Sequence, residues 1–309
     1  MINILFSAPR HNWAEYKDPL RTAFRDVDLR ANLKHTFPPE DVDYIIVAPN
    51  GNLENLTPYS RLKAVFSLWA GIEHIVDNPT LRVPLARMVD PALTQGMVEW
   101  VTGHVLRHHL GIDRHILAAP GEWNPNAPPL APQRKVAVLG LGELGSACAH
   151  ALARLGFCVW GWSRSHKLRK GMQTRYGVEG LEEALTHADI VILLLPATPQ
   201  TENIMNAQTL RLLAPGAFVI NPGRGSLIDD AALLGSLDAG HIAHATLDVF
   251  RTEPLPPEHP YWRHPSVTVT PHIASETRAN SASQSIAQNI KRAESNQPIL
   301  HPVDRTLGY

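Results

Sequence analysis

Residues Val136–Ser165 read VAVLGLGELGSACAHALARLGFCVWGWSRS, and this stretch decides the fold. An apolar run, Lys135–Leu139, leads into the glycine-rich turn, and an alanine-rich run, Ser146–Leu155, follows it. A second apolar run, Phe157–Gly161, comes next. The order predicts a strand, a tight turn, a helix and a second strand, which is the unit that binds a dinucleotide at the edge of a parallel sheet.

The three glycines of GLGELG have separate roles in such a unit. Gly140 permits the tight turn, Gly142 lets a pyrophosphate approach the backbone, and Gly145 lets the helix pack against the strand. Phosphates would accept hydrogen bonds from N–H groups of the first helical turn. A glycine turn without a ligand is the alternative, which the flanking strand and helix disfavour. The predicted cofactor residues of this turn are Gly140, Gly142, Glu143, Leu144 and Gly145.

The end of the second strand indicates which dinucleotide binds. An NAD site usually carries Asp or Glu about twenty residues after the first glycine, where the acid binds the ribose 2′-hydroxyl. This chain instead reads WSRSHK over residues 162–167, without a carboxylate. Arg164, with Ser163, Ser165 and Lys167 close by, offers charge and hydrogen bonds to a 2′-phosphate. A solvated basic loop is the alternative. The sequence therefore favours NADP(H), and NAD(H) stays possible.

Composition is that of an ordinary globular protein long enough for two domains. The 309 residues are 44% hydrophobic and 18% charged, and the net charge of −1 gives no reason to expect nucleic acid or an anionic membrane as a partner. The opening MINILFSAPRHNW lacks a basic region and cleavage site, and no apolar run is long enough to span a membrane. Cys148 and Cys158 are interpreted as buried apolar residues, not as a disulfide or metal pair. We expect a cytoplasmic protein without a metal.

More than a hundred residues precede the glycine motif and form an α/β pattern of their own. The predicted strands there are Ile2–Phe6, Tyr44–Val47 and Lys63–Leu68, which suggest a small parallel sheet. A helix is expected over Gln95–Leu110. Residues Ile116–Pro132 are rich in proline and lack periodicity, which predicts an extended arm that is either a linker or a clasp on a partner subunit.

From Lys135 onward, predicted strands alternate with helices, as a doubly wound sheet requires. The strands are Val136–Leu139, Phe157–Gly161, Ile190–Leu195, Ala217–Asn221, Ala243–Val249 and Val267–Val269. Helix signals lie between them at Leu181–Ala188, Ala207–Gly216 and Asp229–Gly240, and a last helix is expected over Glu276–Ser295. The predicted fold class is α/β.

Three segments follow predicted strands of this second half, at the edge where parallel sheets bind ligands. They read VINPGRGSLID, LDVFRTEPL and VTVTPHIAS. Each holds one residue suited to catalysis: Arg224, Glu253 or His272. Taken singly, these residues could be a surface cation, a helix-capping acid and one of sixteen histidines. On successive strand ends of a nucleotide-binding sheet, they predict an active site.

Four motifs, GLGELG, NPGRG, LDVFRTEP and TPHIAS, occur in an order and spacing that resemble the D-isomer-specific 2-hydroxyacid dehydrogenase family over essentially the whole chain. The segment SLWAGIEHI, Ser67–Ile75, and the WSRS turn are most similar to its glyoxylate/hydroxypyruvate reductase A branch. The resemblance implies two Rossmann-like, doubly wound parallel-sheet domains with the active site in the cleft between them, and a homodimer. It places a substrate-binding domain at residues 1–96 plus 276–309 and a dinucleotide-binding domain at 97–275.

The resemblance also implies roles for the catalytic residues. Arg224 matches the family arginine, whose planar guanidinium holds the carboxylate and keto oxygens of a 2-oxo acid. His272 matches the acid/base residue, since an imidazole exchanges protons near neutral pH. Glu253 matches its partner, which favours the protonated ring and hence reduction.

Further positions are carried over as binding residues. Trp69, Ala70 and Gly71 match the loop whose amides receive the substrate carboxylate, although Trp69 replaces a small residue and a plain turn is the alternative. The implied cofactor contacts are Asp248, which faces the nicotinamide amide, the turn residues Pro196 and Thr198, and Ser275.

The sequence thus predicts NADPH-dependent reduction of a small 2-oxo acid, glyoxylate to glycolate or hydroxypyruvate to glycerate. Two alternatives stay open: an NAD(H)-dependent D-2-hydroxyacid dehydrogenase for a longer substrate, and a non-catalytic module that senses the nicotinamide cofactor. The intact arginine, glutamate and histidine set argues against a purely sensory role.

Overall fold

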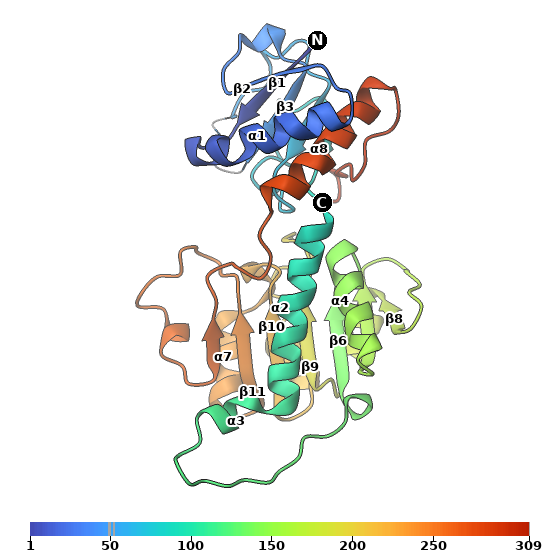
Figure 1. Cartoon of the computed structure of the whole chain (residues 1–309). Helices are drawn as coiled ribbons and strands as arrows, with labels where there is room; N and C mark the ends of the chain where they lie inside the picture. Colours follow the sequence, from blue (N-terminus) through green and yellow to red (C-terminus); the bar gives the residue numbers. More distant parts are fainter. Residues whose placement is uncertain (49–50, 52, 309) are drawn as a thin grey trace. The chain divides into compact units, whose positions relative to one another are not determined.

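The computed structural model describes residues 1–48, 51 and 53–308, and it divides into two compact units. The first comprises Met1–Leu93 and Glu276–Tyr309, and the second comprises Thr94–Ser275 (Figure 1). The sequence placed this division three residues later, after residue 96. Both units are α/β with parallel sheets, so the predicted fold class is confirmed.

The first unit is built on a five-stranded parallel sheet in the order β2-β1-β3-β4-β5. Its strands are β1 (Ile2–Ser7), β2 (Ala31–Lys34), β3 (Tyr44–Val47), β4 (Ala64–Ser67) and β5 (Leu85–Ala86). Strands β3 and β4 are buried along their whole length, which explains their unbroken apolar sequences YIIV and AVFS.

Two helices from opposite ends of the chain cover one face of this sheet. Helix α1 (Arg10–Asp26) and helix α8 (Ala279–Glu294) pack side by side there, with Leu20 and Ile286 in the core beneath them (Figure 1). The short η1 (Pro39–Asp41) leads into β3. Because α8 supplies part of this core, the chain must return to its first unit to complete the fold.

The second unit contains a seven-stranded parallel sheet in the order β12-β11-β10-β9-β6-β7-β8. Its strands are β6 (Lys135–Leu139), β7 (Cys158–Ser163), β8 (Gln173–Tyr176), β9 (Ile190–Leu193), β10 (Ala217–Asn221), β11 (Ile242–Leu247) and β12 (Val267–Val269). The chain starts this sheet at β6, winds outward to β8 and then returns to β9 on the other side of β6. This reversal creates a switch point between β6 and β9, where doubly wound sheets bind ligands.

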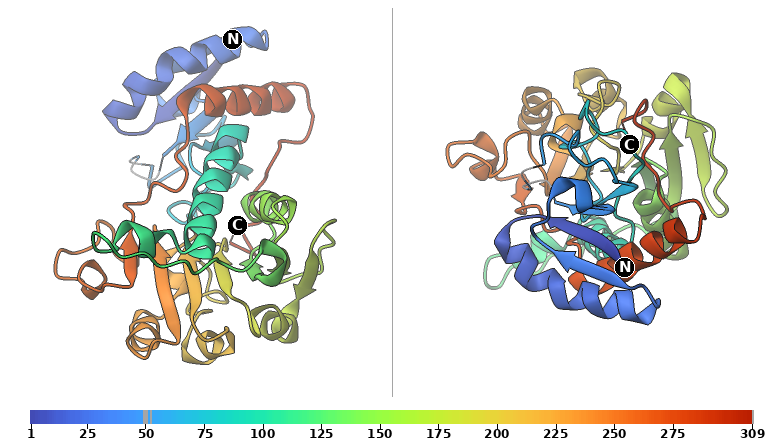
Figure 2. Two further views of the ribbon diagram at one scale, coloured as in Figure 1. Left: turned by 60° about the horizontal axis from the view of Figure 1, so that its bottom comes forward. Right: turned by 90° about the horizontal axis from the view of Figure 1, so that it is seen from above.

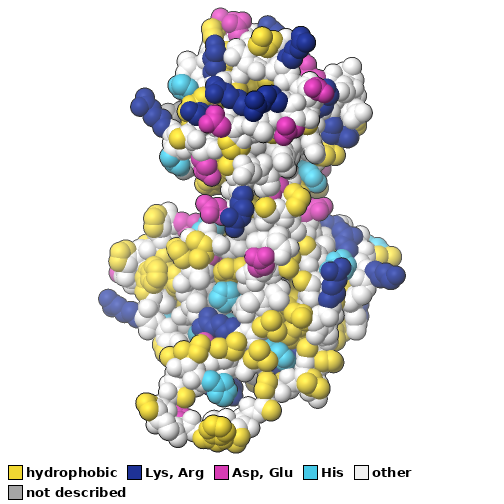
Figure 3. Space-filling model, viewed as in Figure 1, with side chains coloured by type: hydrophobic (Ala, Val, Ile, Leu, Met, Phe, Trp, Pro, Cys, Tyr) yellow, Lys and Arg dark blue, Asp and Glu magenta, His cyan; other side chains and the backbone are white. Residues whose placement is uncertain are grey.

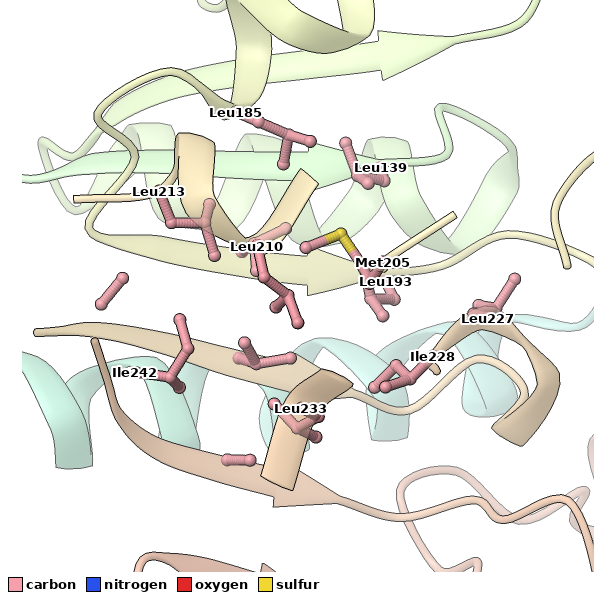
Figure 4. Packing of buried hydrophobic residues seen from close by; sticks show 14 of the residues in the cluster. Leu139, Leu185, Leu193, Met205, Leu210, Leu213, Leu227, Ile228, Leu233 and Ile242 are labelled. Carbon is pink, nitrogen blue, oxygen red and sulfur yellow. The ribbon is translucent and has the colours of Figure 1, made fainter. Parts of the chain in front are cut away.

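Helices cover both faces of this sheet, giving three layers (Figure 2). The helices of the unit are α2 (Pro91–Leu110, whose first residues belong to the first unit), α3 (Ile112–Ile116), α4 (Glu143–Arg154), α5 (Gly177–Leu185), α6 (Ala207–Leu212) and α7 (Asp230–Asp238), with short turns η2 (Ala131–Gln133), η3 (Gly225–Leu227) and η4 (Pro260–Trp262). One buried cluster lies between the sheet and α5, α6 and α7 (Figure 4), and another lies between the sheet and α2 and α4. The Asp229 carboxylate caps α7, as the sequence predicts, by accepting a hydrogen bond from the Ala232 N–H at 3.0 Å.

Several elements escaped the sequence analysis. Strands β2 and β8 are short edge strands, and QTRY of β8 is too polar and exposed to show an apolar pattern. Helix α1 contains Pro19, which obscured its periodicity. The predicted arm over Ile116–Pro132 is extended beyond α3, and its apolar side chains Leu117, Trp123 and Leu130 are exposed by 81%, 91% and 73%.

Two further observations concern the cysteines and membranes. Cys148 is buried as expected, whereas Cys158 is only partly buried, because it lies at the start of β7; both thiols are free. Over the part of the chain that the structure describes, no helix combines the length and apolar character needed to cross a bilayer.

A buried histidine, His108, is expected to make the stability of the second unit sensitive to acid. His108 of α2 is 4% exposed, stacks on the Phe218 ring at 4.6 Å and pairs its Nε2 with the Thr246 hydroxyl at 2.9 Å. Burial, aided by the charges of His244 and Arg107, lowers the pKa of His108 to about 3. The folded state therefore binds fewer protons than the unfolded chain below about pH 6.5, the ordinary histidine pKa.

We predict that the free energy of unfolding falls by about 1.4 kcal/mol per pH unit below pH 6.5 on account of His108 alone. The decrease in unfolding free energy ends as the pH approaches 3, where His108 is protonated in both the folded and the unfolded state. Denaturant unfolding from pH 7 to 4.5 measures the slope, and His108→Gln, which keeps a partner for Thr246 but cannot titrate, should flatten it. An identical slope in both proteins contradicts the prediction.

Candidate active site

The glycine-rich turn after β6 has the conformation that its sequence predicts. Gly140 has φ +109°, and a Cβ there would lie 2.2 Å from the Leu194 carbonyl oxygen. A Cβ on Gly145 would lie 1.8 Å from the Gly140 carbonyl oxygen. Both contacts are backbone, so only glycine fits at these two positions. They hold α4 tightly against β6 and the end of β9.

Gly142 differs from the other two glycines, because the fold itself does not require it. A Cβ at Gly142 would meet no atom of the described residues within 4 Å. Gly142 is also the N-cap of α4, and no side chain among the described residues caps this helix end. The first-turn N–H groups of Glu143 and Leu144 thus face an open space suited to an anion. A side chain at position 142 would fill this space. Because Gly142 has none, the space can accept the pyrophosphate of a dinucleotide.

We predict that alanine at Gly142 weakens cofactor binding, whereas alanine at Gly145 lowers stability. Gly142→Ala should fold with an unchanged melting temperature but bind a dinucleotide at least about tenfold more weakly, because its Cβ enters the phosphate space. Gly145→Ala should lower the melting temperature, because backbone must move to admit its Cβ. Thermal unfolding and fluorescence titration with NADPH measure the two effects. Equal loss of stability in both variants would contradict the distinction.

Basic residues follow β7, where the sequence predicts contacts to a 2′-phosphate. Ser163 is buried as the last residue of β7, and its hydroxyl donates to the Ser165 carbonyl at 2.8 Å, so it braces the turn. Arg164 and Ser165 are exposed, and the Lys167 ammonium donates to the Leu141 carbonyl of the glycine-rich turn at 3.3 Å. No carboxylate lies within Trp162–Lys170.

Arg169 is a further cation at this place that the sequence analysis missed. Its guanidinium donates to the Ser146 hydroxyl at 3.0 Å and to the Leu141 carbonyl at 3.4 Å. The available signal was a second arginine five residues after Arg164, but only the tertiary fold brings it back to the first turn of α4.

The turn after β9 lies across the switch point from the glycine-rich turn. The Thr201 hydroxyl donates to the Pro196 carbonyl at 2.7 Å, and the Thr198 N–H donates to the same hydroxyl at 2.9 Å. Pro196 and Thr198 are therefore held in a hydrogen-bonded turn next to Leu194, which contacts Gly140.

Arg224 follows β10 in a segment fixed by its neighbours. The Asn221 side chain accepts from the Gly223 N–H at 3.1 Å and donates to the Arg224 carbonyl at 2.8 Å. A Cβ on Gly225 would lie 2.0 Å from the Phe250 backbone, so the segment packs directly against the one after β11. The Arg224 guanidinium donates to the Gly223 carbonyl at 2.7 Å.

Glu253 and His272, from the segments after β11 and β12, form a hydrogen-bonded pair. The His272 Nδ1–H donates to Glu253 Oε2 at 2.7 Å, and the Phe250 N–H donates to Oε1 at 2.8 Å. Both carboxylate oxygens are thus engaged, and the imidazole is held with Nε2 as the atom that can exchange a proton. The two side chains are 51% and 35% exposed for His272 and Glu253, so a ligand can reach the ring.

Asp248 holds the turn that carries His272. Its carboxylate is fully buried and accepts from the Thr270 hydroxyl at 2.6 Å and the N–H groups of Ile273 and Ala274 at 2.9 Å. The His272 N–H donates to the Asp248 carbonyl at 2.8 Å, and His272 itself has φ +55°. This network supports an unusual backbone conformation at the proposed acid. The implied contact of Asp248 to the cofactor amide, like that of Ser275, stays a prediction.

The predicted carboxylate loop, Trp69–Gly71, belongs to the first unit and follows β4. The Trp69 N–H donates to the Ser67 hydroxyl at 3.1 Å, and the Trp69 carbonyl accepts from the Met88 N–H at 3.1 Å. The Trp69 side chain is 42% exposed.

Comparisons with known proteins place these features in a family. Residues 103–274 match the family model described as "D-isomer specific 2-hydroxyacid dehydrogenase, NAD binding domain". Over 100% of both chains, the protein is 39% identical to a glyoxylate/hydroxypyruvate reductase A of Serratia proteamaculans and 34% identical to one of Yersinia enterocolitica.

Solved structures agree with this result. A D-isomer specific 2-hydroxyacid dehydrogenase from Xanthobacter autotrophicus Py2, in complex with NADPH and MES, matches with a TM-score of 0.92 and 38% identity over 99% of both chains. An NADPH-dependent glyoxylate/hydroxypyruvate reductase from Sinorhizobium meliloti, in complex with NADP and sulfate, matches with a TM-score of 0.84 and 34% identity over 100% of both. As its motifs predict, this chain belongs to the D-isomer-specific 2-hydroxyacid dehydrogenase family.

Proposed function

We propose that this chain is an NADPH-dependent reductase of small 2-oxo acids, converting glyoxylate to glycolate and hydroxypyruvate to glycerate. The observation that carries the proposal is the Glu253–His272 pair, 2.7 Å apart, at the same sheet edge as the glycine-rich turn and Arg224. An acid/base pair at a dinucleotide edge is what carbonyl reduction needs. Relatives that align over the full chain carry the name of this activity.

The cofactor is NADP(H) in preference to NAD(H). The pyrophosphate fits the open space at Gly142, and the cations Arg164, Lys167 and Arg169 surround the place where NAD enzymes carry an acid. Similar structures hold NADPH or NADP. When bound, the nicotinamide supplies the hydride that reduces the keto carbon.

We predict that Arg164→Ala raises the KM for NADPH at least about tenfold but changes the KM for NADH less than about twofold, because only NADPH has the 2′-phosphate that Arg164 binds. Initial rates with both cofactors at saturating glyoxylate measure the effect. Lys291→Ala, which removes a cation of α8 in the other unit, is the control. An equal loss with both cofactors would contradict the assignment.

Residues of the protein supply the substrate-binding groups and the proton. Arg224 binds the substrate carboxylate and keto oxygen and polarises the carbonyl. His272 donates the proton from Nε2 to the oxygen as negative charge develops there, and Glu253 stabilises the imidazolium before transfer. The amides of Trp69, Ala70 and Gly71 receive the carboxylate.

A panel of 2-oxo acids assayed with NADPH and NADH tests the proposal. Loss of NADPH absorbance with glyoxylate and hydroxypyruvate supports it. Faster turnover of a longer 2-oxo acid with NADH would favour an NAD(H)-dependent D-2-hydroxyacid dehydrogenase that acts on that longer substrate. Tight NADPH binding without turnover of any acid would favour a cofactor sensor.

We further propose a cytoplasmic homodimer that binds no nucleic acid. Hydrophobic side chains gather on the face of the second unit that carries α2 and along the arm (Figure 3), where Ile116, Leu117, Trp123 and Leu130 are exposed. Burial of such side chains against a second copy is favourable. Light scattering of the purified protein tests the dimer, and a monomer would refute it.

A further inference from the structure

The C-terminal segment of the chain lies along the edge strand of the first unit. The Val303 N–H donates to the Leu85 carbonyl at 2.8 Å, and the Arg87 N–H donates to the His301 carbonyl at 3.2 Å. Pro302 forms an antiparallel bridge with Ala86. These bonds fix residues 301–303 beside β5.

Arg305, at the end of this segment, binds three backbone carbonyls with one guanidinium. Its Nε donates to Val76 at 2.8 Å, Nη1 to Leu81 at 2.6 Å and Nη2 to Asn78 at 2.8 Å. The Asp304 side chain accepts from the Thr306 N–H at 2.9 Å, a bond that joins the residues on either side of Arg305. A single side chain thus binds three carbonyls that are more than 220 residues away in sequence.

These carbonyls belong to the segment that continues the predicted carboxylate loop. A helical turn starts at Ile72, immediately after Gly71, and its carbonyl accepts from the N–H groups of Ile75 and Val76 at 3.0 and 2.9 Å. The last carbonyls of a helical turn lack partners within the turn, and a cation there is favourable. Arg305 supplies that cation at the Val76 end of the turn, while Trp69–Gly71 immediately precede its first residue.

We propose that Arg305 is a positioning residue for substrate binding: it fixes the turn behind Trp69–Gly71 and so sets the direction of the amides that receive the substrate carboxylate. This inference rests on the proposed function only for the identity of the ligand. A lysine cannot replace the arginine fully, because one ammonium group cannot reach three carbonyls with the geometry of the planar guanidinium.

The test compares Arg305→Gln and Arg305→Lys with Arg82→Gln, which removes an exposed arginine of the same unit. We expect Arg305→Gln to raise the KM for glyoxylate about tenfold, with kcat changed less than about threefold and the Kd of NADPH unchanged. The KM of Arg305→Lys for glyoxylate should lie between those of Arg305→Gln and the wild-type protein. The KM of Arg82→Gln should equal that of the wild-type protein. A merely destabilised protein would instead lose kcat and NADPH binding together.

Hydrogen exchange of residues 69–81 provides a readout that does not need catalysis. Faster exchange there in Arg305→Gln, with unchanged exchange in the second unit, supports the proposal. Unchanged KM and unchanged exchange overturn it. If the unchanged protein does not reduce glyoxylate, the proposed function fails, and the exchange of this segment still decides the role of Arg305. If Arg305→Gln does not fold, the same measurements on Arg305→Lys decide.

Discussion

Replacement of His272 by alanine is expected to lower kcat for glyoxylate reduction by about 10³- to 10⁴-fold and to leave the Kd of NADPH within a factor of about three. In the proposed mechanism the imidazole gives a proton to the keto oxygen, and water at that position has neither its acidity nor its orientation. The glycine-rich turn, which is the proposed cofactor site, is built from other segments, so binding should survive. Stopped-flow rates and fluorescence titration measure the two quantities.

Two comparisons make this prediction specific. His115→Gln, at an exposed histidine of α3, should leave kcat within about twofold. Glu253→Gln should lower kcat less than His272→Ala, because the amide still accepts from the ring but no longer favours imidazolium. Turnover near the original rate in His272→Ala would remove this residue from the mechanism, whatever the fate of Glu253.

Arg224→Lys is expected to lower kcat/KM for glyoxylate by about 10²- to 10³-fold although the charge is retained. The planar guanidinium can bind the carboxylate and the keto oxygen with separate N–H groups, whereas the ammonium is a point charge that serves one of them. The loss of one charge-assisted hydrogen bond in the transition state is worth about 1.5–3 kcal/mol, and the loss of alignment adds to it. Steady-state kinetics at varied glyoxylate measure the effect.

The surroundings of Arg224 prevent the backbone from moving to compensate for the shorter side chain of a lysine. Gly223 is packed against the backbone of β9 and Gly225 against the backbone of the segment after β11, so the Arg224 segment cannot shift to bring a lysine forward. Arg263→Lys, at an exposed arginine of the same unit, is the matched control and should keep full activity. A kcat/KM for Arg224→Lys within threefold of the original would show that charge alone suffices.

Much of the second unit could be predicted from sequence because its signals are local. The strand Ala217–Asn221 is found at the residues that its apolar run predicts, and β9 differs from its prediction only at its carboxyl end. Buried parallel strands have uninterrupted apolar sequences, and the caps of α7 depend on residues adjacent to it. Polar edge strands such as β8 carry no such signal, because their side chains are partly exposed.

Some features of the site, too, can be predicted from sequence, whereas others cannot. The glycine turn and the strand-end positions of Arg224, Glu253 and His272 follow from motifs, since the carboxyl ends of parallel strands meet at one edge. The sequence does not show that Asp248 holds the turn of His272 through three hydrogen bonds, or that Arg169 returns to Ser146. Such contacts join residues that are 22 to 26 positions apart, and pattern within one segment carries no information about them.

The sequence by itself determined the family, the two α/β units, the dinucleotide turn and the identity of the three proposed catalytic side chains. Only the tertiary structure decided which groups hold His272, namely the Glu253 carboxylate on its Nδ1 and the buried Asp248 beneath its turn, and that Arg305 bonds to the carbonyls of Val76, Asn78 and Leu81. The physical reason is that propensity and periodicity act over one turn or strand, whereas hydrogen-bond partners for buried polar groups are selected by the packing of distant segments.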